Sequence, residues 1–108
     1  MDCLFCKIIN KEMDSGIVFE NDKVIVIKDI HPKAETHLLI IPKKHIESIK
    51  EIEEGDKELM GELLLTAKKI GKEGNLEDYK LKFHVGRGAG QIIDHIHMHL
   101  LSNHAIRN

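Results

Sequence analysis

Three histidines alternate with apolar residues in the segment His95-Ile96-His97-Met98-His99-Leu100-Leu101. Alternate side chains of a β-strand point to opposite faces, so a strand here would place the three imidazoles together on one face. A three-histidine metal centre is disfavoured, because such side chains lie about 7 Å apart at each step along a strand. A neutral imidazole, with an ordinary pKa near 6.5, is nucleophilic at physiological pH and can form a covalent phosphoramidate. The pattern therefore favours phosphoryl chemistry over a structural role.

A glycine-rich loop, Gly86-Arg87-Gly88-Ala89-Gly90, comes directly before the histidine segment. The loop leads into an expected strand, not a helix, and lacks a Gly-Lys-Ser/Thr ending, which excludes both the dinucleotide fingerprint and the P-loop. Glycines do allow backbone N–H groups to approach an anion closely. The position of the loop therefore supports a phosphate ligand near the histidines.

Cys3 and Cys6 form a Cys-x₂-Cys pair near the beginning of the chain. The two residues are too close to close a useful disulfide loop, so metal or redox chemistry is expected. Two thiolates at this spacing can reach one zinc ion, which needs two further ligands to complete a tetrahedron.

Apolar periodicity predicts an α+β fold in which two helices cover about five antiparallel strands arranged as a meander. A short amphipathic helix contains Leu4 and Ile8, has Asp2 as its expected N-cap, and ends before Gly16. The main helix is expected over residues 56–72, where leucines recur at helical spacing. The strands are expected at residues 17–20, 23–28, 38–41, 79–85 and 92–101.

The length and composition limit the class of protein. A chain of 108 residues, 42% hydrophobic and 31% charged, fits one globular domain over residues 1–108. A formal net charge of −2 gives no general attraction to nucleic acid or to an anionic membrane. The apolar runs are too short for a membrane span and no secretory signal is evident, so a cytoplasmic protein is expected.

The histidine segment resembles the His-φ-His-φ-His-φ-φ signature of the histidine triad (HIT) family, and the Hint-type nucleotide-binding branch is the most similar. Three further blocks resemble that family in the same order: Lys28-Asp29-Ile30, the segment from Thr36 to His45, and Ala89-Gly90-Gln91. The resemblance implies a HIT-like fold, and a homodimer whose two sheets join into one. It also implies hydrolysis or transfer of nucleoside monophosphates through a covalent nucleotidyl-histidine.

Carried over by position, the resemblance makes His97 the nucleophile, His99 a phosphate contact, and His37 an additional active-site histidine. Gln91 would hydrogen-bond the phosphate or the leaving group, and Asp29 the ribose hydroxyls. The remaining expected nucleotide contacts are Phe5, Ile8, Ile17, Ile27, Ile30, Leu39, His84 and Gly90. For the apolar members of this set, plain core packing is an equal alternative. The zinc-containing bacterial subtype of the family further implies a structural zinc site of Cys3, Cys6, His45 and His95.

Three positions depart from the family pattern. Ile92 replaces a Ser or Thr whose hydroxyl would bond the phosphate or the leaving-group atom, His84 replaces an Asn, and Asp94 replaces an aromatic residue. Losing one transition-state donor can cost about 10²–10³ in rate. The leading expectation is a hydrolase of purine nucleoside phosphoramidates, such as AMP conjugates, which needs no metal for its chemistry. The alternatives are a dinucleoside polyphosphate hydrolase, a nucleotide-binding protein with little catalysis and, least favoured, a zinc-dependent hydrolase.

Overall fold

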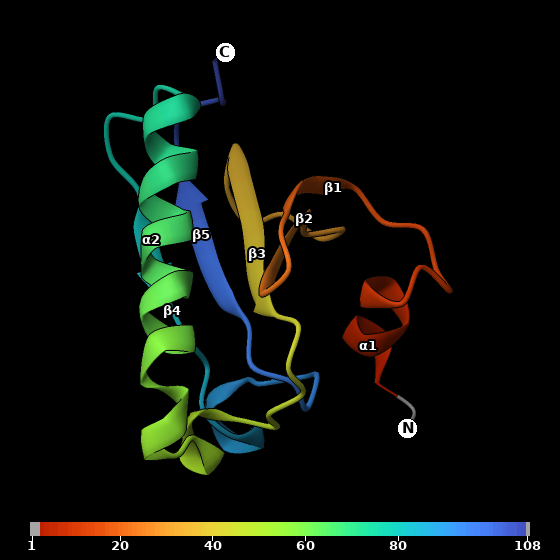
Figure 1. The fold of residues 1–108 in the computed structure, drawn as a ribbon. Helices are drawn as coiled ribbons and strands as arrows, with labels where there is room; N and C mark the ends of the chain where they lie inside the picture. Colours follow the sequence, from red (N-terminus) through yellow and green to blue (C-terminus); the bar gives the residue numbers. More distant parts are fainter. Residues whose placement is uncertain (1–2, 108) are drawn as a thin grey trace.

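A five-stranded antiparallel sheet forms the centre of the protein in a computed structural model that describes residues 3–107 (Figure 1). The strands are β1 (Ile17–Glu20), β2 (Val24–Lys28), β3 (Thr36–Pro42), β4 (Lys80–Lys82) and β5 (Met98–Ser102). Their order across the sheet is β1-β2-β3-β5-β4. The expected five antiparallel strands are confirmed, and β3 and β5 occupy inner positions.

The strand order differs from a simple meander only after β3. Helix α2 (Lys57–Glu73) follows two 3₁₀ turns, η1 (Ile49–Glu51) and η2 (Glu54–Asp56), and leads into the edge strand β4. The chain then returns through a third turn, η3 (Arg87–Ala89), and β5 fills the place between β3 and β4. This order sets β5, which contains the second part of the histidine segment with His99, directly against β3.

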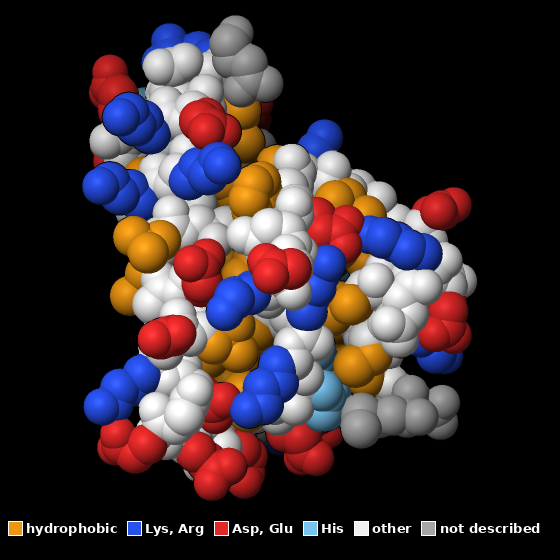
Figure 2. Space-filling view, in the orientation of Figure 1, with side chains coloured by type: hydrophobic (Ala, Val, Ile, Leu, Met, Phe, Trp, Pro, Cys, Tyr) orange, Lys and Arg blue, Asp and Glu red, His pale blue; other side chains and the backbone are white. Residues whose placement is uncertain are grey.

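Helix α2 covers one face of the sheet (Figure 1). Its apolar stripe buries Leu63, Ala67 and Ile70 against side chains from β2, β3 and β5. Burying one such leucine or isoleucine contributes about 1.5–3 kcal/mol, so this layer supplies much of the stability. The outer surface on this side mixes charges of both signs with hydrophobic patches (Figure 2). No helix within residues 3–107 is both long enough and apolar enough to cross a bilayer.

The short helix α1 (Leu4–Ile9) lies on the opposite side of the sheet (Figure 1). Its N-cap in the structure is Cys3, whose Sγ accepts a hydrogen bond from the Cys6 backbone N–H at 3.4 Å. The cap expected from the sequence, Asp2, lies outside the described residues. Helix α1 packs into a second apolar cluster, which contains Phe5, Ile8, Ile25, Ile27, Leu39 and Ile41.

Strands β4 and β5 are shorter than the expected ranges of 79–85 and 92–101. Their ladder spans only the pairs from Lys80–Leu101 to Lys82–His99. The residues before β5 make other bonds instead, including Ile96 N–H to Ile46 O at 2.8 Å. His95 and His97 therefore precede the regular strand, although the alternation of faces persists: Ile96, Met98 and Leu100 all lie in the α2 cluster.

Candidate active site

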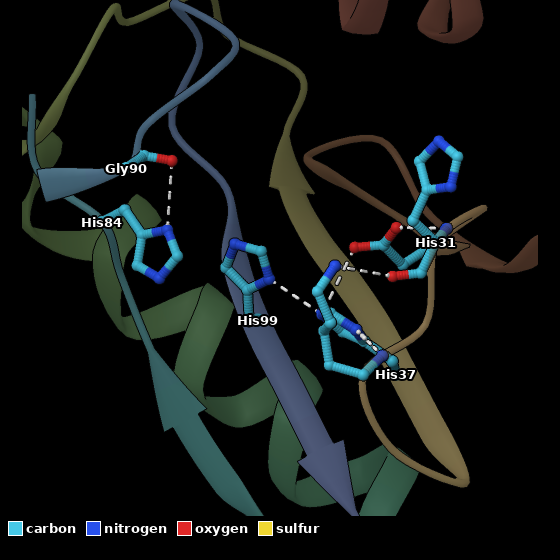
Figure 3. A network of polar contacts seen from close by, with 7 residues as sticks. His31, His37, His84, Gly90 and His99 are labelled. Carbon is cyan, nitrogen blue, oxygen red and sulfur yellow. Dashed lines mark hydrogen bonds and ion pairs between the residues drawn. The ribbon is translucent and has the colours of Figure 1, made fainter. Parts of the chain in front are cut away.

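Four imidazoles gather along one face of the β3–β5 pair. In the register of these strands, His37 lies opposite Leu101 and His99 lies opposite Leu39, which makes the two histidines diagonal neighbours. His37 Nε2 lies 2.9 Å from His99 Nδ1 (Figure 3). The His99 ring centroid is also 5.1 Å from that of His97 and 4.8 Å from that of His84. The structure thus brings the three expected catalytic histidines together with His84.

Hydrogen bonds determine which nitrogen of each ring carries the proton. The Lys33 backbone N–H donates to His37 Nδ1 at 3.1 Å, so the proton of neutral His37 is on Nε2. His37 Nε2–H then donates to His99 Nδ1, which leaves the proton of His99 on Nε2. Within residues 3–107, His99 Nε2 is buried and has no hydrogen-bond partner. A buried donor without an acceptor carries a free-energy cost, and an anionic ligand at this point would remove it.

A hydrogen bond to the backbone fixes the tautomer of His97. Its Nδ1–H donates to the His95 carbonyl at 2.8 Å, which leaves the lone pair on Nε2. The edge of Phe5, carried by α1, contacts the His97 ring with the centroids 5.0 Å apart. Burial among these groups lowers the pKa of His97. A neutral imidazole with a fixed, unprotonated Nε2 is the reactive form for attack on phosphorus.

Burial also keeps the other two histidines neutral. It lowers the pKa of His99 to about 4, with smaller contributions from neighbouring His97, His84 and His37. The pKa of His37 is lowered by burial as well, against the opposing effect of Asp29. All three rings are therefore uncharged at neutral pH.

Asp29 lies beside His37, in the loop between β2 and β3. Its Oδ2 is 3.3 Å from His37 Nε2, and its Oδ1 accepts the His31 backbone N–H at 2.8 Å. Asp29, His37 and His99 lie close enough to share a metal ion. A metal there would need the lone pair of His37 Nε2, which carries the proton while Nδ1 accepts the Lys33 N–H. The cluster is therefore a hydrogen-bond chain.

The six apolar residues expected around a purine separate into two groups. Four of them, Phe5, Ile8, Ile27 and Leu39, are at most 8% exposed and pack in the cluster beneath α1. Ile17 and Ile30 lie at the surface, and Ile30 is 82% exposed. Ile30 is thus the member most open to a ligand, and it directly follows Asp29.

The glycine loop is a tight turn stabilised largely by its own hydrogen bonds. Gly86 and Gly90 have φ of 89° and 95°, the left-handed region that favours glycine. The N–H groups of Ala89 and Gln91 both donate to Gly86 O. His84 Nδ1 lies 3.3 Å from Gly90 O, which joins the loop to the histidine cluster (Figure 3).

Gln91 is buried, and its amide is bonded within the protein. Its Oε1 accepts the Gly86 N–H at 2.9 Å, and its Nε2 donates to Glu47 O at 2.6 Å and to Ile93 O at 3.0 Å. The structure therefore places Gln91 beneath the loop. Because its amide atoms are bonded to the backbone, Gln91 is not oriented toward the phosphate or leaving-group contact that the resemblance implied.

Two features of the site were missed by sequence reasoning. Arg87 makes a bidentate ion pair with Asp94, at 3.1 and 2.9 Å, across the loop. The sequence signal that could have predicted this ion pair is the presence of opposite charges, Arg87 and Asp94, around the glycines. The backbone N–H of Lys33 that orients His37 has no signal in the sequence, because any residue other than proline supplies one.

The second expected cluster, Cys3, Cys6, His45 and His95, is also assembled, with all four ligand atoms within 4.8 Å of one another. His95 Nδ1 lies 3.3 Å from Cys3 Sγ and 3.0 Å from His45 Nδ1, and Cys6 Sγ lies 3.4 Å from His45 Nδ1. Tetrahedral zinc would separate such atoms by about 3.3–3.8 Å, given its ordinary bond lengths. These separations fit a four-ligand zinc site.

The protonation states in this cluster also fit a metal. His95 Nε2 lies 2.7 Å from Pro42 O, so Nε2 is the donor and Nδ1 turns its lone pair toward the cysteines. Without a cation, burial and the neighbouring Cys3 raise the pKa of Cys6 to about 11. A bound metal ion would favour the thiolate instead.

The chain is similar to several known proteins in sequence and in fold. Residues 2–107 match the family model described as "Scavenger mRNA decapping enzyme C-term binding". The chain is 37% identical to Protein HitA of Neisseria gonorrhoeae over 93% of this chain and 94% of that protein. An uncharacterized HIT-like protein of Synechococcus elongatus is 38% identical, over 97% of this chain and 93% of that one.

A crystal structure of a HIT family hydrolase from Legionella pneumophila superposes with a TM-score of 0.92 at 44% identity. That similarity covers 98% of this chain and 96% of the other. A histidine triad protein from Clostridium difficile also superposes with a TM-score of 0.92, at 34% identity over 100% and 96% of the two chains. With its histidines assembled as described, this chain belongs to the histidine triad (HIT) family.

Proposed function

We propose that the protein hydrolyses purine nucleoside phosphoramidates, such as AMP joined to an amine, through a covalent nucleotidyl-histidine on His97. The observation that carries this proposal is the chain of hydrogen bonds that fixes the imidazole protons. These bonds leave His97 Nε2 unprotonated, with its lone pair free. They place the proton of His99 on Nε2, which is buried and has no acceptor among the described residues. One nitrogen is thereby ready to attack phosphorus, and the other to bond a phosphoryl oxygen.

The reaction has two displacements at phosphorus. His97 Nε2 attacks, the bond from phosphorus to the amine breaks, and the amine leaves after taking up a proton from solvent water. A water molecule then attacks the nucleotidyl-histidine, the bond from phosphorus to Nε2 breaks, the proton of that water returns to solvent, and AMP is released with neutral His97 restored. In both steps His99 Nε2–H would stabilise the negative charge on a phosphoryl oxygen, while His37 holds the His99 ring in place.

The nucleoside would bind beside this centre. Asp29 is proposed to accept hydrogen bonds from the ribose hydroxyls, with exposed Ile30 against the base. His84 and Gly90, which are joined by a hydrogen bond, would adjoin the phosphate. Because Phe5, Ile8, Ile27 and Leu39 are buried, we expect them to support the base from beneath, beside Ile17.

We further propose that Cys3, Cys6, His45 and His95 bind a structural zinc ion. With four protein ligands, zinc would leave no open position for chemistry and would act as a cross-link between α1 and the residues before β5. Metal analysis of the purified protein should find one zinc per chain, lost in Cys6→Ser. A folded, active protein without zinc would contradict this.

The function is tested by release of AMP from adenosine 5′-phosphoramidate, with AMP binding measured in parallel. We expect turnover by the wild type and, in His97→Ala, AMP binding without turnover. His104→Ala is the matched control, because that histidine pairs with Asp78 outside the site and its loss should leave turnover unchanged. If the wild type binds AMP but releases none from this substrate, the proposal fails and a nucleotide-binding role is favoured. Faster cleavage of diadenosine polyphosphates would favour the dinucleoside alternative.

A further inference from the structure

The amide of Gln91 connects three segments of the chain at one point. It accepts from Gly86 at the start of the glycine loop, and donates to Glu47 O in the segment after β3 and to Ile93 O ahead of β5. The Gln91 backbone N–H adds a fourth bond, to Gly86 O at 3.1 Å. With 4% of its surface exposed, the side chain is enclosed by these partners.

The orientation of this amide is unambiguous. Rotating it by 180° would set Nε2 against the Gly86 N–H and Oε1 against two carbonyl oxygens, which would replace three hydrogen bonds with three repulsions. Both N–H donors are thus committed to backbone oxygens. A substrate oxygen could gain one of them only by displacing a backbone acceptor in a buried site.

The loop that Gln91 fixes is in turn connected to the catalytic histidines. Gly90 O accepts from His84 Nδ1, and the His84 ring lies against the His99 ring at 4.8 Å between centroids. The Gln91 amide is therefore connected to His99 by direct contacts: a hydrogen bond to Gly86, the loop itself, the bond from His84 to Gly90 O, and the packing of the two imidazole rings. Displacement of catalytic groups by about 1 Å can cost about 10² in rate.

We propose that Gln91 is a positioning residue, which fixes the glycine loop beside His84 and His99 and makes no contact with the substrate. The effect of Gln91 on rate rests on the proposed function, whereas its role in holding the glycine loop does not. The proposal differs from the direct phosphate or leaving-group contact suggested by position in the sequence.

The first test is hydrogen exchange of the Gly86 amide, measured by NMR. We expect this amide to be protected in the wild type and to exchange at least about tenfold faster in Gln91→Ala. Gln91→Glu keeps the side-chain shape and the acceptor for Gly86, so its Gly86 amide should stay protected. Unchanged exchange in Gln91→Ala would overturn the proposal.

The second test compares kcat/KM for AMP joined to amines of different basicity. A positioning residue affects every substrate alike, so Gln91→Ala and Gln91→Glu should each lower kcat/KM by one constant factor, of about 10–10². A factor that changes with the leaving group would show direct contact and overturn the proposal. Glu47→Ala is the matched control, because it removes a neighbouring side chain but keeps the carbonyl that Gln91 uses, and it should retain wild-type rates.

If the wild type shows no turnover, the proposed function fails, but the positioning role of Gln91 can still be tested by AMP binding. The side-chain amide signals of Gln91 should then keep their positions when AMP saturates the protein. A large shift of these signals on AMP binding would show a ligand contact and overturn the positioning role.

Discussion

Two backbone hydrogen bonds fix the proton positions on the histidines of the candidate site. The Lys33 N–H occupies His37 Nδ1, and the proton positions on His37 and His99 follow from it. The His95 carbonyl does the same for His97. Because these partners are main-chain groups, the tautomers are set by the fold and stay the same when surface side chains change.

The lowered pKa values predict activity well below neutral pH. Protonation would remove the acceptor Nδ1 of His99 and charge His37, so activity falls as the pH drops through their pKa values in the folded protein. Burial lowers the pKa of His99 to about 4 and also lowers that of His37. The acid limb of a kcat/KM profile should therefore lie below pH 6.5, the ordinary imidazole value. A midpoint at or above pH 6.5, with folding checked by circular dichroism, would contradict this.

Ile92 offers a test of a missing hydroxyl. The side chain is 79% exposed, so its replacement removes little packing. If relatives use a hydroxyl here to bond the phosphate or leaving group, Ile92→Ser should raise kcat, at most by the factor of about 10²–10³ that one transition-state donor contributes. Ile92→Ala is the control that changes size without adding a donor. Equal rates in the two variants would show that the hydroxyl contributes nothing in this chain.

The spacing of the histidines predicted that His97 and His99 lie together, and their ring centroids are 5.1 Å apart. It could not separate the roles of neighbouring residues. His95 turns toward the cysteines, because its Nε2–H bonds Pro42 O, a group 53 positions away. The sequence likewise gives no sign that the amide of Gln91 bonds Glu47 O, which is distant in sequence. Long-range backbone partners have no local pattern.

Among the elements, the packing of α2 depends on the close approach of Tyr79 to Gly71. A Cβ on Gly71 would lie 2.5 Å from Tyr79 Cε1, whereas a Cβ on Gly61, in the same helix, would meet nothing within 4 Å. Only a glycine at position 71 lets the segment before β4 pack this tightly on the helix. The tyrosine thus helps to fix where β4 begins.

These two glycines form a matched pair for stability. Gly61→Ala should stabilise the protein by about 0.5–1 kcal/mol, because alanine loses less backbone entropy on forming a helix. Gly71→Ala should destabilise it by about 1–3 kcal/mol, the usual cost of overpacking. Urea unfolding monitored by circular dichroism measures both. Stabilisation by both substitutions would show that Tyr79 moves aside at little cost.

The elements themselves were largely predictable, and their ends less so. Residues 57–73 form the expected helix because leucines and alanine recur on one face, and Asp56 precedes it as the N-cap. The alternation of Tyr79, Leu81, Phe83 and Val85 suggested a strand more than twice as long as β4. A ladder requires a partner, and β5 begins only at Met98, so the pattern beyond Lys82 has nothing to pair with.

At the scale of the whole molecule, the edge of the sheet at β4 is available for self-association. β4 is an edge strand, and Leu81 on it is 36% exposed. Leu81 pairs with Leu100, whose side chain packs in the α2 cluster, so both lie on the α2 face of the sheet. Helix α2 also exposes Leu64 and Leu65, at 55% and 62%. An unpaired edge beside exposed leucines is suited to a second copy, whose β4 would continue the sheet.

We therefore expect a homodimer through β4 and α2, and predict that Leu65→Glu shifts it toward the monomer. A charge replacing a leucine in an apolar interface is left desolvated and without a partner, which disfavours association. Val18→Glu is the control, because Val18 is 39% exposed on β1, at the opposite edge of the sheet. Light scattering coupled to size exclusion should give twice the chain mass for the wild type and for Val18→Glu, and a lower mass for Leu65→Glu. A monomeric wild type would show that there is no such interface. Loss of the dimer only in Val18→Glu would place the interface at the β1 edge instead.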